Sequence, residues 1–274
     1  MIYCTVIEPG HGHWRCKTAY MVIAIASQKG GVGKTSTSIS LAAGLARDGH
    51  RVLLIDIDSQ ANSSKVLVSD YPLLAKEQTV CQTVLNREAL PIRPTSVDNL
   101  DIVPSHILLS NTDIELTIAK DHREERLKRA LDEVRNNYDY VFIDCPPTLS
   151  WLTLNAFTAA DEVIVVVAPG YFELDSIVQI SKVIEEVQEY FNPDLRLRGY
   201  LFNMSDPTVN SRTSIQVLRQ TYTGKLLRTI VPRNTDLRDA HFNKQDIFAY
   251  SPKSKAAFAY RKLLKELFYG EETR

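Results

Sequence analysis

The chain has 274 residues, of which 44% are hydrophobic and 24% are charged, a composition typical of globular proteins. It has no run of eighteen apolar residues, so no membrane-spanning helix is predicted. The four cysteines, Cys4, Cys16, Cys81 and Cys145, form no CxxC pair, which indicates neither a zinc site nor a disulfide framework. We therefore expect a cytoplasmic protein.

Apolar runs rich in β-branched residues alternate with amphipathic stretches along the chain. We predict strands at residues 22–27, 52–56, 100–103, 140–144, 163–168, 197–203 and 227–231. We predict helices at 35–48, 124–136, 174–191 and 211–222, and a packing helix at 254–268 whose Phe258, Leu263, Leu264 and Leu267 share one side. This alternation predicts an α/β fold with a doubly wound, mostly parallel sheet, in which ligands bind at the carboxyl ends of the strands.

We expect one domain over residues 21–270, with its most irregular stretch at 71–99. Residues 1–20 precede the first predicted strand and lack the apolar core of a secretory signal. Because Met21 stands directly before that strand, we interpret it as the natural start. Residues 1–20 are then an extension, and residues 271–274 a short tail.

The formal net charge of −1 conceals an uneven distribution. From Leu195 onward the chain has 15 Lys and Arg against 7 Asp and Glu, which gives this part a net charge of +8 and the remainder −9. Scattered solvated lysines are the ordinary explanation of such a surplus. Beside a nucleotide-binding motif, the surplus also suits an anionic partner.

The first predicted strand leads into a glycine-rich loop, and a helical pattern follows the loop. The loop reads Lys29-Gly30-Gly31-Val32-Gly33-Lys34-Thr35-Ser36. Glycines let backbone N–H groups converge on phosphate oxygens, Lys34 is placed to bridge the terminal phosphates, and the Thr35 hydroxyl is placed to bind Mg²⁺. A lone glycine-rich turn can serve packing only, but GKT in register between strand and helix indicates a P-loop that binds ATP.

Two carboxylates follow predicted strands. Asp58 comes just after residues 52–56, and Asp144 ends residues 140–144. Since neighbouring parallel strands end at one edge of a sheet, we expect Asp144 to hold a Mg²⁺-bound water and Asp58 to orient the attacking water. We expect Asp56 to support these two carboxylates without itself binding the ligand. A helix cap or turn is as common a role for any single Asp at a strand end, but the motifs together favour catalysis.

Lys29 stands just ahead of Gly30, which makes the loop KGGVGKT rather than an arbitrary P-loop. This loop resembles the deviant Walker A box of the ParA/MinD family of ATPases. Agreement continues in VLLIDIDSQ at 52–60, FIDCPP at 142–147, NAFTAAD at 155–161 and IVPRN at 230–234. The resemblance spans about residues 21–268 and is closest to the ParA/Soj-type partition ATPases.

The resemblance implies a weak, Mg²⁺-dependent ATPase that forms a homodimer with two nucleotides between its subunits. Lys29 of each subunit would reach the phosphates bound by the other, beside the catalytic Lys34, Asp58 and Asp144. A second cation reaches the triphosphate only when two chains meet, so ATP would be the switch for dimerisation. By the same resemblance, four residues border the adenine: Asn203, Pro232, Arg233 and Asn234.

The resemblance also implies that the ATP dimer binds DNA of the nucleoid without sequence preference, and that a ParB-like adaptor on the cargo stimulates hydrolysis and release. The basic C-terminal part suits phosphate contacts independently. The predicted DNA contacts are Arg219, Lys225, Arg228, Lys253 and Lys255, with Arg219 where family members carry a DNA-contacting arginine. Any one of them alone is more often a solvated surface residue. Departures from the family pattern at Ser59 and Asn203 leave the cargo open: a plasmid, a chromosome or a protein body.

Three alternatives stay open. A MinD-like membrane ATPase would use residues 261–268 as a basic amphipathic anchor, but Glu266, Glu271 and Glu272 oppose anionic lipid, so no stable membrane association is expected. A nitrogenase-like iron protein would need cysteines suited to an iron–sulfur cluster, which their spacing does not support. A nucleotide-gated adaptor without catalysis would not need Asp58 and Asp144.

Overall fold

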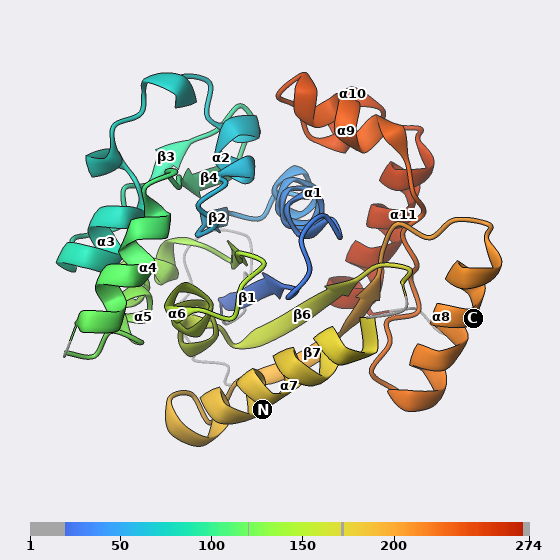
Figure 1. Ribbon diagram of the computed structural model, residues 1–274. Coiled ribbons are helices and arrows are strands. Elements are labelled where there is room, and N and C mark those ends of the chain that lie inside the picture. The colour runs from blue at the N-terminus through green and yellow to red at the C-terminus, as the bar shows by residue number, and fades with distance from the viewer. Residues whose placement is uncertain (1–19, 120, 171–172, 271–274) are drawn as a thin grey trace, which may run out of the picture.

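We analysed a computed structural model of the chain, which describes residues 20–119, 121–170 and 173–270. One central sheet carries helices on both faces (Figure 1). The predicted extension, apart from Tyr20, and the predicted tail lie outside the described residues. None of the described helices is long and apolar enough to cross a membrane.

The sheet has seven strands in the order β3-β4-β2-β5-β1-β6-β7. All neighbouring pairs are parallel except β3 with β4. The strands are β1 (Met21–Ala26), β2 (Val52–Asp56), β3 (Arg93–Pro94), β4 (Leu100–Val103), β5 (Tyr140–Asp144), β6 (Glu162–Val167) and β7 (Arg196–Phe202). The predicted doubly wound α/β fold is confirmed.

The α-helices connect and cover the strands. They are α1 (Lys34–Arg47), α2 (Asn62–Leu67), α3 (Val80–Asn86), α4 (Leu109–Ile118), α5 (Arg126–Asp132), α6 (Trp151–Ala159), α7 (Glu173–Tyr190), α8 (Val209–Thr221), α9 (Thr235–Phe242), α10 (Ile247–Tyr250) and α11 (Lys255–Leu264). Short 3₁₀ turns are η1 (Tyr71–Leu73), η2 (Lys76–Gln78) and η3 (Arg135–Asn137), and a π-helical turn, η4 (Lys265–Tyr269), continues α11.

The sheet separates two apolar cores because successive residues of a strand point to opposite faces. In β1, Val22 and Ala24 belong to the core that α3 to α7 cover. Ile23 and Ile25 belong to the core that α1, α2 and α9 to α11 cover. Since the central strands are buried on both faces, their sequences are continuously apolar rather than alternating.

The prediction of a strand at residues 227–231 is wrong. This segment follows β7 through the isolated bridges Tyr200–Leu226 and Ser205–Pro232, but no regular ladder forms. The backbone N–H groups of Arg228 and Thr229 instead donate to the Glu266 carboxylate, at 2.6 and 2.8 Å. A side chain 37 residues further along the chain therefore takes hydrogen bonds that a strand would need.

The C-terminal helix packs as predicted, with one exception. Tyr260, Leu263, Leu264 and Leu267 are buried, whereas Phe258 is 62% exposed, so its predicted place on the packed side is wrong. The region predicted as irregular, 71–99, contains α3 and the edge strand β3. The helix predicted at 124–136 is two pieces, α5 and the turn η3.

Candidate active site

The P-loop joins β1 to α1 in the middle of the sheet. Gly31 and Gly33 have φ angles of 77° and 94°, a left-handed conformation that glycine adopts without strain. Gly33 is the N-cap of α1. A Cβ atom at Gly30 or Gly31 would meet no atom within 4 Å, so this side of the loop can approach a phosphate closely. The helix N-terminus adds its unpaired N–H groups and partial positive charge.

Lys34 is the first residue of α1, and its side chain is almost fully buried. Its Nζ lies 3.4 Å from the carbonyl oxygen of Lys29. Burial lowers the pKa of Lys34, and the negative charges of Asp144 and Asp58 act against this shift. The ammonium therefore lies in a confined place beside two carboxylates, where a triphosphate would supply further compensating charge.

Asp144 connects the P-loop helix with α2. It ends β5, and the strand register pairs it with Ile25 of β1 and Asp56 of β2. Its carboxylate accepts hydrogen bonds from Ser38 Oγ at 3.1 Å and Ser63 Oγ at 2.7 Å. Burial raises the pKa of Asp144, while hydrogen bonds from Ser63, Thr35 and Ser38 and the charge of Lys34 lower it.

Asp56 supports the loop that carries Asp58. Its carboxylate accepts hydrogen bonds from the Asp58 backbone N–H at 3.1 Å and from the N–H and hydroxyl of Ser64 at 2.9 and 2.7 Å. Burial, and then the nearby Asp144 charge, raise the pKa of Asp56. Asp58 is itself buried, and its carboxylate accepts from the Gln60 N–H at 2.9 Å. Asp56 thus has the supporting position predicted for it.

The remaining P-loop residues differ in exposure. Val32 is buried, Thr35 and Ser36 are half-buried, and Lys29 is exposed. The Lys29 backbone N–H lies 3.3 Å from Ser27 Oγ, which ties the loop to the end of β1. The exposed position of Lys29 is compatible with the predicted reach toward a second subunit.

Asn203 holds the P-loop from the end of β7, a strand separated from β1 by β6. It directly follows β7, and its side-chain amide donates to the Val32 carbonyl at 2.8 Å and accepts from the Met204 N–H at 2.9 Å. The predicted adenine-side residues Pro232 and Arg233 run beside Ser205, and Asn234 caps α9. The side chains of Asn203 and Asn234 are therefore engaged within the chain, so adenine contacts from this region remain a prediction.

Four serines of the site were not predicted. Ser38 and Ser63 bind Asp144, Ser64 binds Asp56, and Ser105 Oγ donates to the Asp58 carbonyl at 2.7 Å. Ser38 lies one helical turn after Lys34, and Ser63 lies in the first turn after the Asp58 loop. Their spacing from the predicted residues was the only sequence signal that could have identified them.

The predicted DNA contacts are all exposed. Arg219 is in the last turn of α8, Lys225 and Arg228 follow that helix, and Lys253 and Lys255 lie at the start of α11. Helices α8 and α11 lie on the same side of the molecule, opposite α3 to α5 (Figure 1). The structure therefore places these five side chains where a large anion can reach them.

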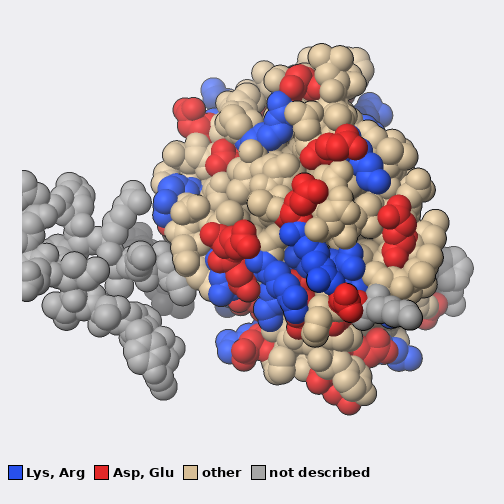
Figure 2. All heavy atoms as spheres, turned by 90° about the vertical axis from the view of Figure 1, so that its left-hand side faces the viewer, with Lys and Arg blue, Asp and Glu red and all other residues tan. Residues whose placement is uncertain are grey.

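Figure 2 shows basic and acidic side chains gathered on the opposite side of the molecule, over α3 to α5. A hollow of about 210 Å³ there is lined by Arg87, Glu88, Ala89, His122, Arg126, Arg129, Ala130 and Glu133. Arg87 pairs with Asp121 at 3.3 Å and Arg129 with Glu125 at 2.9 Å. Arg87 and Arg129 are therefore paired within the chain, and none of the predicted DNA contacts belongs to this hollow.

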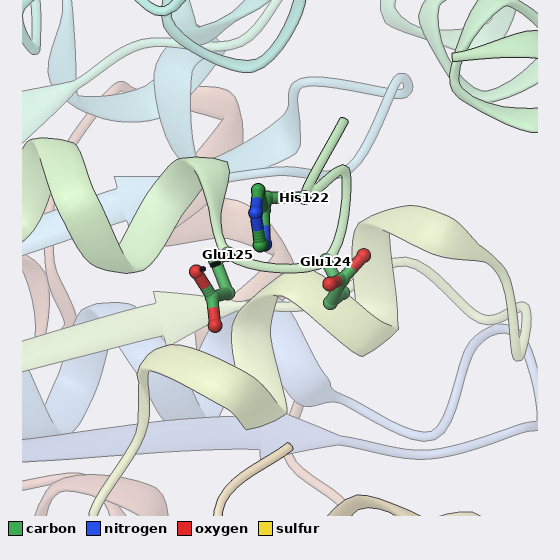
Figure 3. Close-up of side chains that lie close together, drawn as sticks. All are labelled: His122, Glu124 and Glu125. Carbon is green, nitrogen blue, oxygen red and sulfur yellow. Dashed lines mark ion pairs between the residues drawn. The ribbon is translucent and has the colours of Figure 1, made fainter. Parts of the chain in front are cut away.

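His122, Glu124 and Glu125 lie together beside this hollow, with ligand atoms within 4.8 Å of one another (Figure 3). Glu125 already pairs with Arg129 and lies 3.7 Å from His122 Nδ1. The group is solvent-accessible and has an ion-pair role, so it is not assigned as a metal site.

Two structural features bear on the alternative functions. Leu263, Leu264 and Leu267 are buried, so the C-terminal amphipathic segment has its apolar side in the core rather than free for lipid. Cys81 and Cys145 are free and fully buried, and burial raises the pKa of both thiols. Buried thiols of this kind are inert structural residues rather than cluster ligands at a subunit surface.

A glycine-rich strand-to-helix loop with a buried lysine, beside two carboxylates at the ends of adjacent parallel strands, defines a P-loop nucleotide hydrolase. Residues 20–197 match the AAA domain family. The chain is 40% identical over 257 residues to the sporulation initiation inhibitor protein Soj of Bacillus subtilis, covering 90% of this chain and 97% of Soj. It is 36% identical over 261 residues to the chromosome partitioning protein ParA of Myxococcus xanthus, covering 94% and 91%.

The fold also matches a solved structure of cobyrinic acid a,c-diamide synthase from Mycobacterium smegmatis with bound ADP and magnesium. The TM-score is 0.78 at 33% identity, over 90% of this chain and 93% of that one. The chain belongs to the ParA/MinD family of partition ATPases, as its resemblance to Soj and ParA predicted.

Proposed function

We propose that this chain is a cytoplasmic, nucleoid-associated partition ATPase that dimerises with ATP, binds DNA without sequence preference and leaves it after hydrolysis. A ParB-like adaptor on the cargo stimulates that hydrolysis. The observation that carries the proposal is the convergence of the P-loop, Asp58 and Asp144 at one edge of three adjacent strands. The similarity of the chain to Soj and ParA over most of its length supports the same proposal.

ATP and Mg²⁺ fit the residues of this site. The backbone from Gly30 to Ser36 and the buried Lys34 would hold the phosphates, and Thr35, Asp58 and Asp144 would hold the metal and its waters. Mg²⁺ supplies charge neutralisation on the phosphates when bound. The fit rests on oxygen donors, which Mg²⁺ prefers, and on the hydroxyls that fix the Asp144 carboxylate. The M. smegmatis protein contains ADP and magnesium.

Dimerisation would complete the site. Lys29 is exposed at the start of the loop, whereas Lys34 is buried, so of these two lysines only Lys29 is accessible to a second subunit. Lys29 would then act on the nucleotide of the second subunit. Because this charge is useful only in the paired state, bound ATP would favour the dimer and hydrolysis would release it.

The DNA surface would be formed by Arg219, Lys225, Arg228, Lys253 and Lys255, with affinity supplied by phosphate contacts. Two chains in one dimer double the number of these contacts, so DNA binding would depend on ATP. A stable association with membrane is not proposed.

The experiment compares three proteins in ATP and Mg²⁺: wild type, Lys34→Ala and Asp58→Ala. We expect Lys34→Ala to lose ATP binding because the phosphates lose their buried cation. We expect Asp58→Ala to bind ATP and to remain a DNA-bound dimer because the attacking water is not oriented. Light scattering measures the molar mass, which distinguishes monomer from dimer. Fluorescence anisotropy measures the affinity for DNA. A monomeric Asp58→Ala protein in ATP would contradict the proposal.

Arg219→Glu tests the DNA surface separately. We expect weaker DNA binding and a smaller salt slope, with dimerisation unchanged, because a phosphate contact is lost. Lys182→Glu makes the same charge change at an exposed position of α7 and is the matched control. Loss of dimerisation in Arg219→Glu would assign that residue a structural role. Absence of ATP turnover with and without DNA and adaptor would favour the non-catalytic adaptor.

A further inference from the structure

A groove of about 750 Å³ lies between the C-terminal end of α1 and the C-terminal helix. Its lining is Gly44, Arg47, Asp48, Phe248, Arg261, Leu264, Lys265, Tyr269 and Gly270. Helix α1 runs from Lys34 at the P-loop to Arg47 in this groove, a distance of roughly 20 Å at the usual helical rise. The groove is therefore separate from the phosphate-binding loop.

The floor of the groove is apolar. Phe248 and Leu264 are 9% and 4% exposed and pack where α1 and α11 meet. The two helices approach closely here because residue 44 has no side chain: a Cβ atom would lie 2.3 Å from Leu264 Cδ1. Tyr269 adds a half-exposed ring at one end.

The rim of the groove is mostly cationic. Its charged lining residues are three cations, Arg47, Arg261 and Lys265, and one carboxylate, Asp48. Arg47 pairs with the buried Asp246 at 2.7 Å, and Asp48 accepts a hydrogen bond from the Tyr269 hydroxyl at 2.8 Å. Lys265 makes no side-chain hydrogen bond or ion pair within the described part of the chain. Arg261 likewise forms no ion pair within the described residues, so the groove keeps a surplus of positive charge.

The guanidinium of Arg261 lies over the Phe248 ring, 5.2 Å from its centroid, and one of its nitrogens donates to the Pro252 carbonyl. This arrangement holds a planar cation above an aromatic floor. The π-helical turn η4 carries both Lys265 and Tyr269 into the lining, and such turns are frequent at functional sites.

We propose that this groove is a second ligand site, which takes a small organic anion with an aromatic ring. The ring would lie on Phe248 and Leu264, and the anionic group would lie at Arg261 and Lys265, away from Asp48. The volume is within the usual range for small-molecule sites, and the combination of an apolar floor with a few charged groups is typical of them. The site is independent of the proposed partition activity.

The sequence offers specific reporters for a test by NMR. Ala43–Gly44 is the only Ala-Gly pair in the chain, Tyr269–Gly270 the only Tyr-Gly pair and Val32–Gly33 the only Val-Gly pair. Carbonyl-¹³C labelling of alanine, tyrosine or valine together with ¹⁵N-glycine therefore isolates one amide in each sample. Two of these amides lie in the groove, and Gly33 reports on the P-loop.

The probe is 1-naphthalenesulfonate, titrated into the nucleotide-free full chain, with uncharged 1-naphthalenemethanol as its control. We expect saturable shifts at Gly44 and Gly270, none at Gly33, and binding of the uncharged compound that is at least about tenfold weaker. A shift at Gly33 alone, no saturable shift, or equal affinity for the uncharged compound would overturn the proposal.

Lys265→Glu and Lys262→Glu separate the groove from general surface charge. Both residues are exposed on the same helical segment, but only Lys265 lines the groove. We expect Lys265→Glu to weaken binding of the sulfonate about tenfold and Lys262→Glu to leave it unchanged. Equal weakening by the two variants would overturn the proposal, and equal melting temperatures would show that both remain folded.

Discussion

Replacing Gly33 by alanine is expected to damage the P-loop through one contact. The φ angle of 94° strains any residue with a Cβ by about 1–2 kcal/mol. The new Cβ would lie 2.2 Å from Asn203 Nδ2, so the amide must leave the Val32 carbonyl to which it is bound at 2.8 Å. Losing that buried hydrogen bond costs about 1–3 kcal/mol. We therefore expect a total destabilisation of about 3 kcal/mol.

Gly49→Ala is the matched control for this prediction. Gly49 has a φ angle of 91°, but a Cβ there would meet no atom within 4 Å, so only the backbone strain applies. Urea unfolding of both variants without nucleotide gives the difference in their free energies of unfolding. The midpoint temperature of thermal unfolding should fall by about 6–12 °C in Gly33→Ala. If Gly33→Ala destabilises the protein no more than Gly49→Ala does, then Asn203 does not hold the P-loop.

Two further predictions concern other parts of the chain. Glu266→Gln should destabilise the protein by about 1–3 kcal/mol, because the Arg228 and Thr229 N–H groups donate to different carboxylate oxygens and the amide keeps only one oxygen. Hydrogen exchange at these two amides should accelerate, and exchange as slow as in wild type would contradict the interpretation. In a variant with Cys4→Ser and Cys16→Ser, the buried Cys81 and Cys145 should not react with a disulfide reagent at about pH 8 until urea unfolds the chain. Rapid reaction of the folded variant would show that a thiol is accessible.

The central part of the fold and the candidate site could be predicted from the sequence. The apolar runs of β1, β2, β5 and β6 are buried on both faces, and such strands are continuously apolar. The glycine-rich loop and the two aspartates follow these strands directly. Adjacent parallel strands end at one edge of the sheet, so the local sequence was enough to predict that these groups lie close together.

The remainder depends on contacts between distant segments. The Glu266 carboxylate accepts hydrogen bonds from two backbone N–H groups of the segment predicted as a strand. No local pattern near residue 228 indicates this contact. Asn203 binds the P-loop carbonyl of Val32, although the two residues are 171 positions apart in the sequence. Short helices such as α2 and α10 contain too few turns to show a clear period.

Subunit complementation tests the central claim, that Lys29 acts on the nucleotide of the partner subunit. Lys29→Ala and Asp58→Ala are each expected to be inactive in ATP hydrolysis with DNA and adaptor present. In a one-to-one mixture, half of the dimers contain one subunit of each kind, and each mixed dimer has one complete site. We therefore expect roughly a quarter of the wild-type turnover per chain. Turnover no higher than the sum of the two variants measured alone would contradict it.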